Sequence, residues 1–158
     1  MILYHSSNKD FNKINHQGEG SISTIFGNEK VKREGIFLSD NPKFTSNFGN
    51  ILYTVKADIK NTLDIRNGFM YEDIEKLRDL LNERWMESIS PYNSWNIFDG
   101  EDAKEIIKKI KKAGYDSVIL KEECHSTGIM NNTFVVFDDN RLNIINKMDS
   151  SLKRKRRI

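Results

Sequence analysis

The chain has 158 residues, of which 37% are hydrophobic and 30% charged, a balance typical of a folded domain and too apolar for a disordered chain. Its 25 basic and 23 acidic residues give a net charge of +2, but five basic residues lie in the last six positions, so the rest carries 20 − 23 = −3. No stretch approaches the roughly 18 apolar residues of a membrane span, and the start does not resemble a secretory signal. We therefore expect one cytoplasmic domain over residues 1–149 and a basic tail over residues 150–158.

The first third of the chain predicts two short strands, a long loop and a helix. Apolar residues over Ile2–His5 predict a strand, and the polar, glycine-containing stretch 9–32 predicts the loop. Ile36–Leu38 predict a second strand. A helix is expected to begin at Pro42, after a capping aspartate or asparagine, and to end at Gly49.

The remainder of the chain predicts strands on either side of a helical middle. Residues 51–60 have strand-like apolar spacing, whereas residues 71–86 repeat apolar side chains at helical spacing. A second helix is expected over residues 101–113, with lysines clustered near its end and a glycine after it. Residues 115–120 and 133–137 predict two neighbouring antiparallel core strands, separated by a polar loop.

Four segments of the chain match a known family in order and spacing: LYHSS, GIFLSDNPKFTSNFG, AGYDSVIL and NNTFVVFDDNRLNII. Together they resemble the ADP-ribosyltransferase domains of polyvalent proteins from phages and mobile elements, within the diphtheria-toxin and poly(ADP-ribose) polymerase class. The resemblance spans the chain from Leu3 to about Ile145. It implies an α+β fold in which two packed antiparallel sheets, flanked by helices, surround an NAD-binding cleft.

The resemblance also implies a set of residues that bind NAD. His5 corresponds to the histidine that hydrogen-bonds the ribose, and the backbone of Ser6, where the family more often has glycine, would face the nicotinamide amide. Phe37 and Phe48 occupy the family's two aromatic positions, the second of which stacks on nicotinamide. Thr45 lies where a hydroxyl often meets the amide. Taken alone, a histidine or phenylalanine at such positions is more often a structural residue.

The sequence departs from the family at the catalytic carboxylate. Thr133 occupies the position of the glutamate of many members. A carboxylate there stabilises the positive charge that develops on the ribose as the bond to nicotinamide breaks. Synthesis of ADP-ribose chains is therefore not expected. Glu123, or an acidic group of the acceptor itself, is the candidate substitute.

The expected function is transfer of one ADP-ribose from NAD to a protein or nucleic acid, with release of nicotinamide. The expected setting is a bacterial or phage-infected cell, with an antitoxin or immunity partner, and the hydrolase described next would act there as a toxin or defence effector. Two alternatives stay open: a binding module that has lost catalysis, and a hydrolase that transfers ADP-ribose to water. No metal is expected, because the single cysteine and three histidines are not spaced as ligands.

Overall fold

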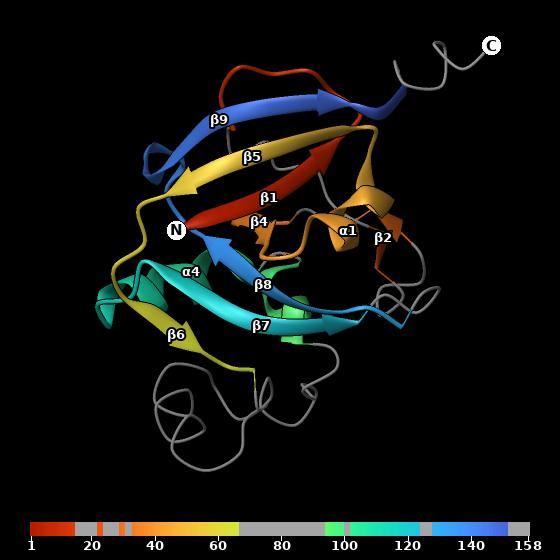
Figure 1. The fold of residues 1–158 in the computed structure, drawn as a ribbon. Helices are drawn as coiled ribbons and strands as arrows, with labels where there is room; N and C mark the ends of the chain where they lie inside the picture. Colours follow the sequence, from red (N-terminus) through yellow and green to blue (C-terminus); the bar gives the residue numbers. More distant parts are fainter. Residues whose placement is uncertain are drawn as a thin grey trace, which may run out of the picture.

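Seven strands of the computed structural model form one mixed sheet (Figure 1). The structure describes residues 1–14, 22–23, 29–30, 33–66, 94–99, 102–123 and 128–151. In sheet order the strands are β6 (Thr62–Asp64), β7 (Ser117–Glu123), β8 (Met130–Val136), β4 (Ile36–Ser39), β1 (Ile2–Ser7), β5 (Ile51–Ala57) and β9 (Leu142–Asp149). A separate antiparallel pair consists of β2 (Ile22–Ser23) and β3 (Glu29–Lys30). The helical elements are α1 (Pro42–Thr45), η1 (Ser46–Phe48), η2 (Ser94–Phe98), α4 (Ala103–Lys112) and η3 (Asp139–Arg141).

The predicted arrangement of two packed antiparallel sheets flanked by helices is wrong. Strand β4 pairs with β8 and is bridged to β1 through Tyr4 and Ser39, so the strands join into a single sheet. The sheet is mixed because β6 runs parallel to β7, whereas the other neighbours are antiparallel. Within the described ranges the named α-helices are α1 and α4, and residues 150–151 are also helical. Motif order along the chain does not determine which strand edges meet, and the bridge between β1 and β4 decides the architecture.

Most local predictions are confirmed. Strands form at the expected segments near both ends, and β7 and β8 are antiparallel neighbours. Helix α1 begins at Pro42 and is capped by Asn41, whose side chain accepts a 3.0 Å hydrogen bond from the backbone N–H of Lys43. Helix α4 is followed by Gly114, whose φ of +99° favours glycine. Strand β9 was not predicted, and the helix expected over residues 71–86 lies outside the described residues, as does the tail from residue 152.

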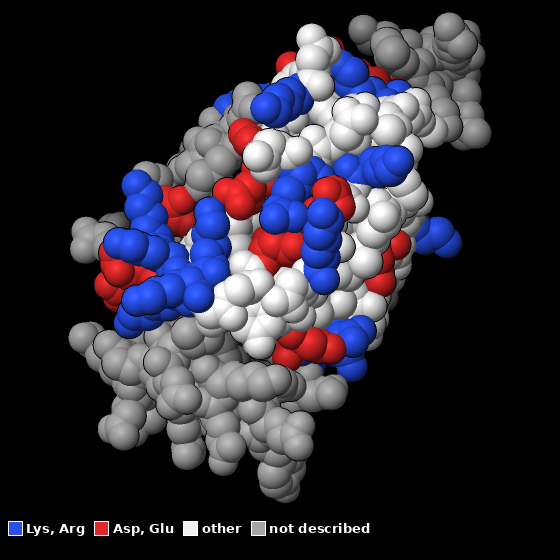
Figure 2. Space-filling model, turned by 90° about the vertical axis from the view of Figure 1, so that its left-hand side faces the viewer, with Lys and Arg blue, Asp and Glu red and all other residues white. Residues whose placement is uncertain are grey.

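Two hydrophobic clusters cover the two sides of the sheet. Alternation along β7 directs Val118 and Leu120 into the first cluster and Ile119 into the second. The first cluster also contains buried residues of α4 and η2, which lie behind β7 and β8 in Figure 1. Because α4 buries Ile106 and Ile110 there, its lysines face outward, and Figure 2 shows blue side chains gathered on that part of the surface.

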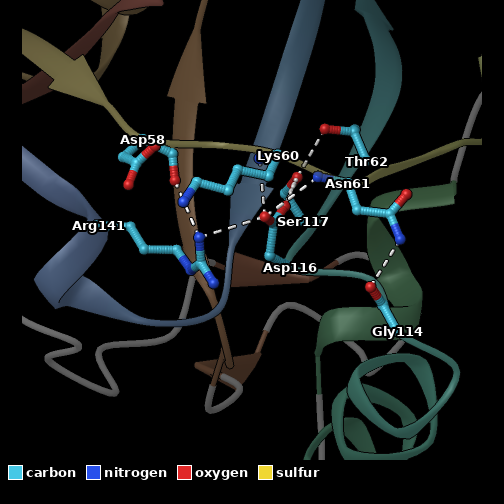
Figure 3. A network of polar contacts seen from close by, with 8 residues as sticks. All are labelled: Asp58, Lys60, Asn61, Thr62, Gly114, Asp116, Ser117 and Arg141. Atoms are coloured by element: carbon cyan, nitrogen blue, oxygen red, sulfur yellow. Dashed lines mark hydrogen bonds and ion pairs between the residues drawn. The ribbon is translucent and has the colours of Figure 1, made fainter.

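A buried aspartate joins the parallel edge of the sheet to the turn before β9. One carboxylate oxygen of Asp116 accepts backbone hydrogen bonds from Lys60 at 2.8 Å and Asn61 at 3.1 Å, and lies 3.3 Å from the guanidinium of Arg141 (Figure 3). The other oxygen accepts a 2.9 Å bond from the hydroxyl of Ser117. Although burial acts to raise it, the pKa of Asp116 is lowered because these donors stabilise the carboxylate. This Asp116 network holds β6 in place beside β7.

Replacing Gly49 with alanine should destabilise the fold by about 1–3 kcal/mol. The φ of Gly49 is extended and open to any residue, but an added Cβ would lie 2.2 Å from the backbone carbonyl carbon of Ser7. Urea unfolding of Gly49→Ala and of the neighbouring Asn50→Ala measures the effect. Asn50 is exposed, so its replacement should change stability by less than about 0.5 kcal/mol. Equal stability of the two variants would show that the turn relaxes around the methyl group.

Candidate functional site

Four polar side chains from three adjacent strands form a hydrogen-bonded chain, which we call the Glu122 network. Glu122 on β7 lies opposite Asn131 on β8, and Thr133 on β8 lies opposite Ser39 on β4. The Thr133 hydroxyl donates to the Glu122 carboxylate at 2.8 Å and accepts from the Asn131 amide at 2.7 Å. The Ser39 hydroxyl donates to the Asn131 side-chain oxygen. Ser39, Asn131 and Thr133 are buried, so the network positions Glu122 firmly.

Glu122 has an altered affinity for protons. Burial raises the pKa of its carboxyl group above the usual value, and the hydrogen bond from Thr133 and the positive charge of Arg33 offset only part of that increase. A carboxylate of raised pKa is better suited to accept a proton near neutral pH than an ordinary surface glutamate. It can equally stabilise positive charge that develops close to it.

The ring of Phe37 is already packed against neighbours. The guanidinium of Arg33 lies 4.3 Å from its ring centroid, and the ring of Phe98 meets it edge-on at 5.8 Å. Arg33 is held there by Asp99, through bonds of 2.7 and 3.1 Å to the two carboxylate oxygens. The structure therefore gives Phe37 a packing role on β4, two residues before Ser39 of the Glu122 network.

His5 lies where pairing between β1 and β4 stops. The two strands are bridged at Tyr4 and Ser39, and their described residues form no further pair, although both strands continue. The Nδ1 atom of His5 instead lies 3.0 Å from the backbone carbonyl of Phe37. Because a carbonyl can only accept, Nδ1 carries the hydrogen, and Nε2 keeps a lone pair that can accept a ligand hydroxyl. Burial lowers the pKa of His5, against the opposing effect of the bond to Phe37, so the ring is neutral at pH 7.

Ser6 and Thr45 contact one another, whereas Phe48 lies on the surface. The Ser6 hydroxyl donates to the Thr45 hydroxyl at 3.1 Å, which in turn donates to the carbonyl of Pro42 at 2.9 Å. The Ser6 proton therefore connects β1 to α1, whereas the Thr45 proton makes a bond within α1. Phe48 is 61% exposed, and its ring centroid lies 5.6 Å from that of Phe44. An exposed ring of this kind offers a face on which a flat ligand can stack.

The structure brings Glu122, and not Glu123, to Thr133. Strand β7 continues to Glu123, beyond the segment expected to be extended, and Glu123 is exposed and lies opposite Met130. Strand alternation was the signal that could have identified Glu122, because it lies two residues after the buried Leu120 and shares its side of the strand. The interpretation of residues 121–132 as a loop concealed that alternation.

An open pocket of about 430 Å³ lies next to the Glu122 network. Its lining comes from the start of α1 and the adjoining ends of β7 and β8: Asp40, Asn41, Pro42, Lys121, Met130, Asn131 and Asn132. Asn131 belongs to both the lining and the network. Asn131 therefore connects the wall of the pocket to the Glu122 network.

Two kinds of feature are absent from the described residues. No three histidine, cysteine or acidic side chains in the described ranges are grouped to hold a metal ion. Within the same ranges, no helix has the length and apolar character needed to cross a membrane.

Comparisons with known proteins show a shared fold. No protein family matches the sequence, and no curated protein is similar to it. One similar solved structure is described as the crystal structure of an anti-CRISPR protein. The match has a TM-score of 0.50 and 16% sequence identity, and it covers 94% of this chain and 95% of the other. At this identity the match shows similarity of fold over almost the whole of both chains.

Proposed function

We propose that this chain transfers a single ADP-ribose from NAD to a macromolecule, with Glu122 as the catalytic carboxylate. The observation that carries the proposal is the hydrogen bond between Glu122 and Thr133. Thr133 occupies the position where the resembled family has its glutamate. Glu122, on the neighbouring strand, has a carboxylate oxygen 2.8 Å from the Thr133 hydroxyl, which supports Glu122 as the source of the carboxylate that residue 133 lacks.

Two residues outside the Glu122 network carry groups that fit parts of the NAD molecule. Nε2 of His5 is an acceptor for a ribose hydroxyl, and the exposed ring of Phe48 can stack on the nicotinamide. Phe37, Ser6 and Thr45 would act mainly by holding these elements in place, because their rings and hydroxyls already contact neighbours.

The proposed reaction breaks the bond between the ribose C1′ carbon and the nicotinamide nitrogen, whose electrons leave with nicotinamide. Positive charge then develops on the ribose, and the Glu122 carboxylate stabilises it. A nucleophile of the acceptor forms the new bond to C1′. Its proton passes to Glu122 or to water, and the raised pKa of this carboxyl group makes it a suitable acceptor.

Nicotinamide release from NAD by the purified chain tests this function. We expect release that depends on added cell extract and leaves labelled ADP-ribose on either the protein or the nucleic-acid fraction. Equal release without extract would identify a hydrolase that transfers ADP-ribose to water. The absence of release under both conditions, with the chain folded, would contradict NAD chemistry.

Anti-CRISPR activity without NAD chemistry is a second candidate function. One observation favours it, namely that the similar solved structure is described as an anti-CRISPR protein and matches nearly the whole chain. A folded chain that releases no nicotinamide, yet protects a targeted plasmid in cells with an active CRISPR system, would support this candidate over the transferase.

A further inference from the structure

Helix α4 presents a surface of lysines to solvent. The helix buries Ala103, Ile106 and Ile110 against the first hydrophobic cluster, which directs its other side outward. We call the exposed lysines on that side the basic α4 face, namely Lys104, Lys108, Lys109, Lys111 and Lys112. Figure 2 shows blue side chains gathered on this part of the molecule.

The positive charge of the basic α4 face is only partly balanced. Lys111 forms a 2.9 Å ion pair with Asp138, and Glu105 is the one acidic residue within the helix. No acidic residue among those described forms an ion pair with Lys104, Lys108 or Lys112. These three lysines follow one another at intervals of four, so they form a stripe of about 12 Å along the helix.

The helix dipole explains only part of this stripe. The negative end of the helix dipole stabilises basic residues only in the last turn, which accounts for Lys109, Lys111 and Lys112. Lys104 lies in the first turn, next to the positive end of the dipole, where a lysine is unfavourable. Lys108 lies in the middle of the helix and gains little. The helix dipole therefore does not account for Lys104 and Lys108.

We infer that the basic α4 face binds the phosphate backbone of a nucleic acid. A regular row of exposed ammonium groups on a rigid helix matches a regular row of phosphates, and each contact releases counterions from the nucleic acid. This inference goes beyond the proposed function, because such binding requires neither NAD nor Glu122. If the transferase is also correct, the face would bring nucleic acid to the protein as its partner or acceptor.

Charge reversal of Lys104 and Lys108 tests the inference. The double variant Lys104→Glu/Lys108→Glu should keep its helix, because the first substitution favours the positive dipole end and the second allows a pair with Lys112 four residues later. The matched control is Lys13→Glu/Lys43→Glu, which changes net charge equally at exposed lysines on other elements. Binding to a short fluorescent DNA duplex is measured by anisotropy without NAD, between about 50 and 200 mM salt.

We expect the α4 variant to bind the duplex at least about tenfold more weakly at the lowest salt. The slope of the logarithm of its binding constant against the logarithm of salt concentration should be smaller in magnitude by about two. The control should stay close to wild type in both respects. Two results would overturn the inference: equal loss of binding in both variants, which indicates a nonspecific effect of net charge, and the absence of wild-type binding near 50 mM salt. Binding to polyglutamate but not to the duplex would also overturn it and indicate an acidic protein partner. Because NAD is absent, none of these results bears on the transferase.

Discussion

Replacing Glu122 with glutamine should reduce nicotinamide release by about 10²- to 10⁴-fold. Glutamine keeps the size of the side chain and an oxygen that can accept from Thr133, but it carries no negative charge for the ribose. Glu123→Gln is the matched control, since Glu123 is exposed on the same strand and should be replaceable without loss. Equal activity of the Glu122 variant and wild type would remove Glu122 from the mechanism.

The Glu122 variant should also remain folded. The pKa of the Glu122 carboxyl group is higher in the folded chain than in the unfolded chain, so the folded chain binds the Glu122 proton more tightly. Wild type therefore loses stability from this proton as pH rises through the folded pKa. Glutamine has no such loss, and at pH 7 the variant should be at least as stable as wild type in urea unfolding. Stability at least equal to that of wild type would show that a loss of activity does not come from unfolding.

The activity of the wild-type chain should fall as pH decreases through the pKa of Glu122, because protonation removes the required charge. Thr133→Val removes a hydrogen bond that lowers this pKa. The midpoint of the acidic limb should then move to higher pH. An unchanged midpoint would mean that another group controls the limb.

Replacing Asp116 with alanine should lower the free energy of unfolding by about 3–5 kcal/mol. The side chain is 10% exposed, and its removal leaves two backbone N–H groups and the Ser117 hydroxyl without their acceptor. Asp138→Ala is the control, because the Asp138–Lys111 pair is exposed and its loss should cost less than about 1 kcal/mol. Urea unfolding at pH 7 compares the two variants.

Low pH should weaken the stabilisation that the Asp116 carboxylate provides. Because the pKa of Asp116 is lower in the folded chain, its contribution is complete above the unfolded value of 3.8 and is lost as pH falls through the folded pKa. Wild-type stability should therefore decrease below about pH 4 more steeply than that of Asp116→Ala. Parallel curves would assign the acid sensitivity to other carboxylates.

The sequence predicted local structure well because the local signals are strong. Asn41 and Pro42 start α1 as expected, and Gly114 follows α4. The arrangement of the strands was not accessible in this way. It depends on one bridge, between Tyr4 and Ser39, and on the parallel pairing of a three-residue strand, and neither leaves a periodic pattern in the sequence.

The sequence could indicate only some residues of the candidate site, because the others come together through strand pairing. The family resemblance pointed to Thr133 and His5, and in the structure Thr133 bonds to Glu122 and His5 to the carbonyl of Phe37. It did not identify Glu122, Asn131 or Ser39, because they come together through the register of three strands. Because the predicted strand ended at residue 120 and β7 extends to Glu123, the sequence analysis could not distinguish Glu122 from the exposed Glu123.

The strand order also affects how the chain is made. Strand β8 lies between β4 and β7, but it begins at Met130, long after β4 ends at Ser39. At a synthesis rate of roughly 5–20 residues per second, β4 waits for roughly 5–20 s with one edge open. Chains that terminate early would keep that edge exposed and would be prone to associate with one another. The ribosome must therefore synthesise β8 before β4 and β7 can be joined in one sheet.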